Sequence, residues 1–132
     1  MESVQKVYDF LESAKTFYLA TAEGDQPRVR PYGAMLLYEG RIYIMAFGQT
    51  NATRQIARNP KAEICAFHGQ TLRIECLLAE DNRPEVGKAL VDKMPSLKAA
   101  LGDNGENGVM YYLKDATATF YKVMEPVETV RF

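Results

Sequence analysis

Arginines and a tyrosine take alternate positions in the motif RVRPYG, which begins at Arg28. Successive side chains of a β-strand point to opposite faces, so Arg28, Arg30 and Tyr32 are expected on one face. Pro31 cannot donate a hydrogen bond to a neighbouring strand, which predicts a sheet edge or a bulge. Two guanidinium groups beside Gly33, where a ligand can approach the backbone closely, indicate a site for a planar molecule that carries a phosphate. An edge strand with solvated arginines is the alternative interpretation.

A second candidate anion site lies in the motif GQTNATR, where a helix is expected to begin directly after a strand. Helix N-termini present unpaired N–H groups and a partial positive charge. Thr50, Asn51 and Thr53 add hydroxyl and amide groups, and Arg54 adds a cation. Capping of the helix by Thr50 or Asn51 is the simpler interpretation. The two motifs flank one predicted hairpin, so a single phosphate could contact both.

Familiar catalytic motifs are absent from the sequence. His68 is the only histidine, and it falls in a predicted turn without a neighbouring pattern of serine and aspartate. This placement argues against a catalytic triad and favours a solvent-exposed histidine. The sequence also lacks HExxH, a zinc-spaced set of cysteines and histidines, GxGxxG and the P-loop motif. A chain so poor in catalytic side chains either binds a ligand or takes its chemistry from a cofactor.

The composition describes one ordinary globular domain, residues 1–132. Hydrophobic residues make up 47% of the chain and charged residues 25%, which is typical of such domains. The 16 lysines and arginines nearly balance the 17 aspartates and glutamates, for a net charge of −1. We therefore expect no nucleic-acid partner. No apolar run is long enough to cross a membrane and the N-terminus lacks a signal-peptide pattern, so we expect a cytoplasmic protein without a membrane partner.

The two cysteines, Cys65 and Cys76, are not expected to form a disulfide. The cytoplasm is reducing. A hairpin centred on residues 69–70 would also place Cys76 opposite Glu63 rather than Cys65. We therefore expect two buried thiols that pack as small hydrophobic groups.

Hydrophobic periodicity, turn residues and prolines divide the chain into short elements. Expected helices cover residues 4–14, 52–58, 84–94 and 97–101. Expected strands cover residues 16–21, 28–37, 41–47, 61–67, 72–78, 109–113, 116–124 and 127–132, the first three of them as a meander. Runs of strands joined by tight turns are typical of antiparallel barrels. The expected fold class is therefore mainly β, an antiparallel barrel with satellite helices.

Three stretches of the sequence, PRVRPYG, QIARNPKAEIC and LKDATATFY, have an order and spacing that resemble the pyridoxamine 5′-phosphate oxidase-like flavoproteins. The resemblance runs from about Tyr8 to Phe132. It is strongest to the small branch that includes the nitroimidazole-resistance proteins. It implies a split β-barrel of Greek-key-like topology that forms a homodimer and binds FMN at the subunit interface.

The resemblance also implies roles for residues of both motifs. Arg30 aligns with the arginine that contacts the FMN phosphate, and Arg28 remains a candidate from the strand pattern. The predicted contacts of the two strands with the flavin ring are Pro31, Tyr32, Gly33, Met45 and Ala46. The predicted phosphate-binding loop and helix start contain Thr50, Asn51, Thr53 and Arg54.

The chain departs from its relatives at two positions in this region. Relatives often carry a lysine where Asn51 stands, and the oxidases proper carry one where Met35 stands. The chain also lacks the C-terminal substrate-binding residues of those oxidases. Oxidation of vitamin B6 is therefore not expected.

The leading hypothesis is an FMN-dependent oxidoreductase. It would take electrons from a reduced nicotinamide or another small donor and pass them to a small acceptor, for example a nitroaromatic one. A second hypothesis, favoured by the missing catalytic side chains, is a non-catalytic barrel that holds a flavin, a deazaflavin or a haem for sensing or storage. Haem would need an axial ligand, and only His68 is available. A barrel that has lost its ligand and serves protein interactions is a third hypothesis.

Aromatic side chains crowd the last predicted strands. The rings are those of Tyr111, Tyr112, Phe120, Tyr121 and Phe132. A chain of this size is not expected to bury them all, and an exposed apolar patch often marks an interface. The pattern therefore predicts a homodimer, and filling of the barrel interior by these rings is the alternative.

Overall fold

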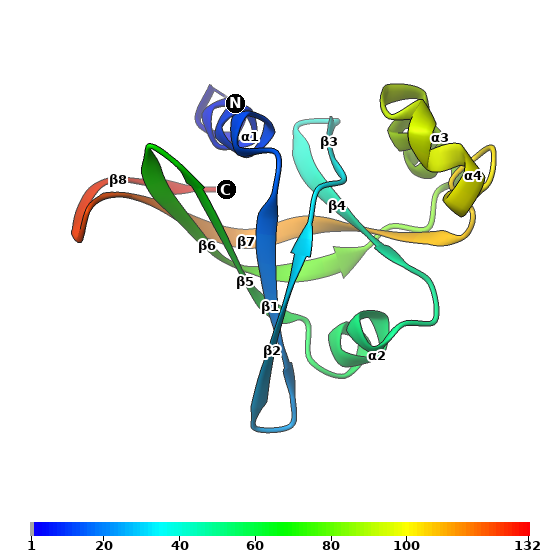
Figure 1. Cartoon of the computed structure of the whole chain (residues 1–132), viewed down its shortest axis with the longest axis horizontal. Coiled ribbons are helices and arrows are strands. Elements are labelled where there is room, and N and C mark those ends of the chain that lie inside the picture. Colours follow the sequence, from blue (N-terminus) through cyan, green and yellow to red (C-terminus); the bar gives the residue numbers. More distant parts are fainter. Residues whose placement is uncertain (1) are drawn as a thin grey trace.

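The computed structural model describes residues 2–132 and is shown in Figure 1. The strands are β1 (Phe17–Glu23), β2 (Gln26–Tyr32), β3 (Met35–Tyr38), β4 (Arg41–Phe47), β5 (Lys61–His68), β6 (Gln70–Glu80), β7 (Gly108–Lys122) and β8 (Glu125–Arg131). The helices are α1 (Glu2–Ala14), α2 (Asn51–Arg58), α3 (Pro84–Lys93) and α4 (Lys98–Leu101), with a 3₁₀ turn η1 (Pro95–Leu97) before the last. In this described part of the chain, no helix is long and apolar enough to span a membrane.

The strands form one antiparallel sheet with the order β2-β1-β5-β6-β7-β4-β3, and β8 pairs with β7. The strands at the two ends of this order, β2 and β3, are joined by only two residues, Gly33 and Ala34. The sheet must therefore curve until its ends meet, as Figure 1 shows. Within the described residues β2 and β3 form no ladder with each other. The result is the split antiparallel barrel that the sequence predicts.

The expected single strand over residues 28–37 is wrong, because the chain breaks it at Gly33. β2 pairs with β1 at the sheet edge that Pro31 predicts, whereas β3 pairs with β4. A Cβ atom at Gly33 would lie 3.3 Å from the carbonyl oxygen of Lys15, so the glycine allows a close passage past the end of α1. Both pairings of the expected meander are present, β1 with β2 and β3 with β4. The break at Gly33 divides its middle strand, so that β2 and β3 lie at opposite ends of the strand order.

Near its C-terminus the chain has one long strand where two are expected. Residues 109–113 and 116–122 belong to the continuous strand β7, which pairs with β6 through an irregularity. Residues 123–124, expected in the second strand, form the turn to β8. Asp115 has a φ of 51° there, and the register on β6 shifts between Glu75 and Leu77. A bulge of this kind bends a long strand without separating it from its partner.

The hairpin of β5 and β6 turns at Gly69, which has a φ of 77°. The expected register is wrong by one residue, because Cys76 lies opposite Ala62 and not Glu63. Both cysteines are free thiols. Cys76 is buried as expected, whereas Cys65 is exposed, so the expectation of two buried thiols is wrong for Cys65.

Two apolar cores lie on opposite faces of β4. The larger core fills the barrel and includes Ile42 and Ile44 from β4 and Leu11 from α1. The smaller core lies between β4 and α3 and includes Tyr43 and Leu90. Burial on both faces explains why the apolar run of β4 is uninterrupted.

Two of the five aromatic rings in the predicted C-terminal strands lie inside the barrel. Tyr111 and Phe120 are each 2% exposed and belong to the larger core. For these two rings the alternative, filling of the barrel, is confirmed, whereas Tyr112, Tyr121 and Phe132 are half-buried. The large apolar side chains that are exposed include Tyr18, Val29, Phe67, Val123 and Met124.

Candidate functional site

A buried hydrogen-bond network joins β1, β2 and α2. Arg30 donates from Nη1 to the Thr21 hydroxyl oxygen at 2.7 Å and from Nη2 to Gln55 Oε1 at 2.8 Å. The Thr21 hydroxyl donates to Gln55 Oε1 at 2.6 Å. Thr21 and Gln55 are 4% and 6% exposed. Because a guanidinium group has five N–H donors, this anchoring of Arg30 leaves donors for a ligand.

The first turn of α2 is fixed by reciprocal capping. The Thr50 hydroxyl oxygen accepts from the Thr53 N–H at 3.4 Å, and the Thr53 hydroxyl oxygen accepts from the Thr50 N–H at 3.1 Å. Capping by Thr50, the simpler interpretation of this motif, is therefore confirmed. Within residues 2–132 the N–H groups of Asn51 and Ala52 have no acceptor, and they remain available to an anion.

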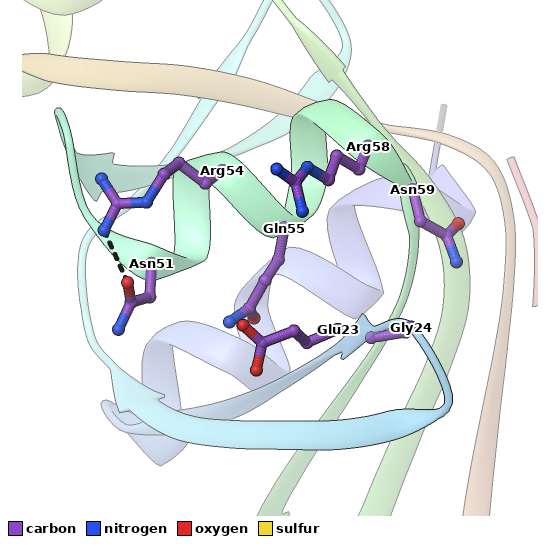
Figure 2. A pocket seen from close by; sticks show the side chains of 8 residues that line it. Glu23, Gly24, Asn51, Arg54, Gln55, Arg58 and Asn59 are labelled. Atoms are coloured by element: carbon purple, nitrogen blue, oxygen red, sulfur yellow. Dashed lines mark hydrogen bonds between the residues drawn. The ribbon is translucent and has the colours of Figure 1, made fainter.

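A cleft of about 490 Å³ lies between α2 and the β1–β2 turn (Figure 2). Asn51, Arg54 and Arg58 line it from one side of the helix. Arg54 donates to Asn51 Oδ1 at 2.5 Å and to the Gln49 carbonyl oxygen at 3.2 Å. In the described chain Arg58 has no ion pair or side-chain hydrogen bond. We call this the polar cleft, and its two arginines suit an anionic group.

Arg28 points to the same side of β2 as Arg30 but has a different partner. Its Nε and Nη2 atoms donate to Glu23 Oε1 at 3.0 and 2.8 Å, and both side chains are about half exposed. Glu23 lines the polar cleft, so Arg28 lies at its rim. Because a carboxylate already neutralises its charge, we expect Arg28 to contribute less to anion binding than Arg30.

A second cleft of about 350 Å³ has an apolar lining, and we call it the apolar cleft. Pro31, Tyr32 and Gly33 contribute from the end of β2. Its other lining residues are Ala34, Met45, Phe47, Met94 and Leu97. Burial raises the pKa of Tyr32 against the opposing charge of Arg30, so the phenol keeps its proton at neutral pH.

The two clefts are neighbours along the chain. Phe47 lines the apolar cleft, and its carbonyl oxygen accepts from the Thr50 hydroxyl at 2.9 Å where α2 begins. Asn51, the next residue, lines the polar cleft. An elongated ligand with a planar apolar end and an anionic end can therefore contact both.

Most of the residues singled out from the sequence lie in or beside these clefts. Arg54 lines the polar cleft and Met45 the apolar one. Ala46 differs, because its side chain is 1% exposed and belongs to the barrel core. Only its main chain is left to contact a ligand. His68 lines neither cleft and packs edge-on against Phe10, with ring centroids 6.2 Å apart.

Sequence reasoning missed three residues of this region. Gln55 is a buried amide on the same helix face as Ala52 and Ile56. A polar residue on an apolar helix face indicates a buried hydrogen-bond partner, and this pattern could have identified Gln55. Arg58 follows Arg54 by one helical turn, and this spacing predicts that both arginines lie on the same face of the helix. Thr21 gave no signal, because threonine is ordinary in a strand.

A family model described as pyridoxamine 5′-phosphate oxidase matches residues 3–101. The chain belongs to the pyridoxamine 5′-phosphate oxidase-like family. A NimC/NimA family protein from Clostridium acetobutylicum is 34% identical to it, with a TM-score of 0.92 over 99% of this chain and 93% of that one. No curated protein sequence matches the chain significantly.

Two more distant structures share the fold of this pyridoxamine 5′-phosphate oxidase-like chain. General Stress Protein 26 from Bacillus anthracis is 19% identical, with a TM-score of 0.76 over 100% of both chains. A protein related to general stress protein 26 from Clostridium acetobutylicum is 12% identical, with a TM-score of 0.72 over 99% of this chain and 95% of that one. At these identities the similarity shows the split-barrel architecture alone.

The pyridoxamine 5′-phosphate oxidase-like family binds flavins, and the residues here fit a flavin that carries a phosphate. Arg30 and the polar cleft supply guanidinium and amide donors for a phosphate. The apolar cleft supplies a wall for a ring system. Asn51 is neutral, and Arg54 and Arg58 supply the positive charge of the polar cleft.

Proposed function

We propose that this chain binds FMN and acts as an oxidoreductase on small molecules. The Arg30 network carries the proposal, because it holds a guanidinium group with unused donors against Gln55, a residue that lines the polar cleft. When bound, FMN supplies the redox chemistry between a reduced nicotinamide or another donor and a small acceptor. A nitroaromatic acceptor is the example that the resemblance to nitroimidazole-resistance proteins supports.

In this proposal the side chains and N–H groups of the protein bind and orient the flavin. Arg30 and the first N–H groups of α2 bind the phosphate, and Arg54 adds a cation. The apolar cleft holds the ring and excludes water from one side of it. Tyr32 keeps its proton at neutral pH, so its hydroxyl would be able to donate a hydrogen bond to a bound flavin.

A non-catalytic barrel that holds a flavin or a deazaflavin is the second candidate. The lining of the apolar cleft favours it, because Tyr32 is the one residue there whose side chain can transfer a proton. A haem held in either cleft would find no histidine among the lining residues. Turnover with nicotinamide donors and a panel of nitro and quinone acceptors separates the candidates, since a module binds flavin without turnover.

We also propose a homodimer with the flavin at its interface. On the outer face of β1, β2 and β5, Tyr18, Val29 and Phe67 are 49%, 69% and 70% exposed. Tyr18 lies opposite Cys65 in the β1–β5 ladder, so the exposed groups share one face of the sheet. Exposed apolar faces often mark interfaces. Sedimentation at micromolar concentration should give a dimer, and a monomer would contradict the arrangement.

The visible absorption spectrum tests the cofactor directly. The purified protein is measured before and after addition of FMN and desalting. A flavin spectrum that survives desalting is expected for the wild type and for Arg131→Ala, which changes an exposed arginine of β8. Arg30→Ala should lose it. A colourless wild-type protein after desalting would overturn the FMN proposal.

A further inference from the structure

The apolar cleft adjoins a charged one beyond Gly33. This third cleft has a volume of about 430 Å³ and is lined by Glu12, Lys15, Gly33, Met35, Lys93 and Met94. It shares Gly33 and Met94 with the apolar cleft. We call it the lysine cleft. A molecule seated against the apolar cleft can therefore extend a substituent into the lysine cleft.

The charge of Lys93 is compensated within the protein. Lys93 Nζ donates to the carbonyl oxygen of Met35 at 2.7 Å and forms an ion pair with Glu12. The Tyr8 hydroxyl also donates to Glu12. Burial raises the pKa of Glu12, but the hydrogen bonds from Lys93 and Tyr8 outweigh it and hold this pKa below its ordinary value. Glu12 is therefore ionised at neutral pH and balances Lys93.

The charge of Lys15 has no such partner. Lys15 follows the last residue of α1, is exposed, and has no ion pair within the described residues 2–132. Its backbone is fixed by its N–H, which donates to the Leu11 carbonyl oxygen at 3.0 Å. The three charged residues of the lysine cleft thus leave a net charge of about +1 on Lys15. A lysine ammonium is a point charge that binds carboxylate or phosphate oxygens.

We propose that the lysine cleft binds the anionic group of a small aromatic substrate, with Lys15 as the contacting cation. The aromatic ring of the substrate then lies at Gly33 and Met94, which the two clefts share, beside the flavin ring in the apolar cleft. The substrates of this chain are then aromatic compounds that carry a carboxylate or a phosphate. The inference rests on the proposed function for the redox role of the substrate, whereas the binding itself depends only on the two clefts.

Methionine-methyl NMR tests the binding with three probes: 4-nitrobenzoate, 4-nitrophenyl phosphate and uncharged nitrobenzene. Met35 and Met94 line the lysine cleft, whereas Met124 is 84% exposed at the β7–β8 turn. Both anionic probes, or one of them, should shift Met35 and Met94 and leave Met124 unchanged. Lys15→Gln should weaken that binding by about two- to fivefold, the scale of an exposed charge pair. The tighter anionic probe identifies the preferred group.

Control variants separate charge from structure. Lys15→Arg keeps the charge and should bind the anionic probes like the wild type. Lys122→Gln, at the exposed end of β7, should change no affinity. Nitrobenzene should bind Lys15→Gln and the wild type within about twofold. Equal affinity of wild type and Lys15→Gln for both anionic probes, or shifts confined to Met124, would overturn the proposal.

FMN retention after desalting, measured on the same samples, tests the proposed function separately. If FMN is retained and the affinity for the anionic probes does not depend on Lys15, the proposal for the lysine cleft is overturned and the proposed function stands. Lost FMN with anion binding that needs Lys15 overturns the redox role and supports the cleft as an anion site.

Discussion

The polar and apolar clefts are built by neighbouring segments of the chain, yet different forces hold them. In the polar cleft, Arg30 is placed by hydrogen bonds to Thr21 and Gln55, which are both buried. In the apolar cleft, Met45 is placed by packing in the smaller core. Hydrogen bonds depend on direction and apolar packing does not. An anionic end of a ligand should therefore depend on few residues, and a ring end on many that each contribute little.

The largest expected effect is that of Arg30→Ala on FMN binding. Removing a charged hydrogen-bond donor should weaken FMN affinity by about 2–3 kcal/mol, or roughly 30- to 160-fold. Riboflavin, which lacks the phosphate, should lose almost nothing. Fluorescence titration of both flavins measures the difference. Equal losses for the two flavins would show that Arg30 does not contact the phosphate.

Phe47→Ala should have a smaller effect of a different kind. Phe47 lines the apolar cleft and is 46% exposed, so its removal costs about 1 kcal/mol of apolar contact. FMN and riboflavin should lose affinity equally, because both carry the ring. Val127→Ala, on the exposed part of β8, is the control. A loss of affinity for FMN but not for riboflavin would show that Phe47 supports binding of the phosphate and not of the ring.

Arg28→Ala should weaken FMN affinity by about 0.5 kcal/mol or less, because Glu23 already pairs with this exposed arginine. The same titration, repeated at low and high salt, checks it. Arg28→Ala should lose much less FMN affinity than Arg30→Ala, because Arg28 lies at the rim of the polar cleft. A loss as large as that of Arg30→Ala would place Arg28 on the phosphate.

The smallest expected effect is that of Glu12, which lines the lysine cleft, on the free energy of unfolding at acid pH. The folded-state pKa of Glu12 is lowered, so its contribution to stability is present above its unfolded-state pKa and is lost as pH falls through the folded value. Glu12→Gln should cost about 0.5 kcal/mol at pH 7, the size of an exposed ion pair, and less at about pH 3, because this contribution is lost as the pH falls. Urea unfolding at the two pH values measures this. An equal cost at both would exclude the ion pair with Lys93 as its cause.

Local features of this chain could be predicted where neighbours in sequence determine them. Reciprocal capping by Thr50 and Thr53 involves residues three apart, and the start of α2 follows from them. Pro31 predicts the sheet edge because it lacks an N–H, whatever lies around it. The apolar run of β4 predicts a strand, although it does not tell which face meets which core.

Distant contacts could not be predicted in this way. The break of the strand at Gly33 depends on the passage of Lys15 at the end of α1. The joining of β7 across Asp115 depends on β6 as a partner. The burial of Tyr111 depends on closure of the whole barrel.

The sequence by itself determined the split-barrel family, the order of most elements and the two motifs with the chemistry of an anion site. Only the tertiary structure decided that Arg30 is anchored by Thr21 and Gln55, which lie 9 and 25 residues away. It also decided that Arg28 is paired with Glu23 and that Ala46 turns its side chain into the barrel. The physical reason is range. Propensity and periodicity report interactions within a few residues, whereas the partner of a polar side chain is set by which strands the closed barrel brings together.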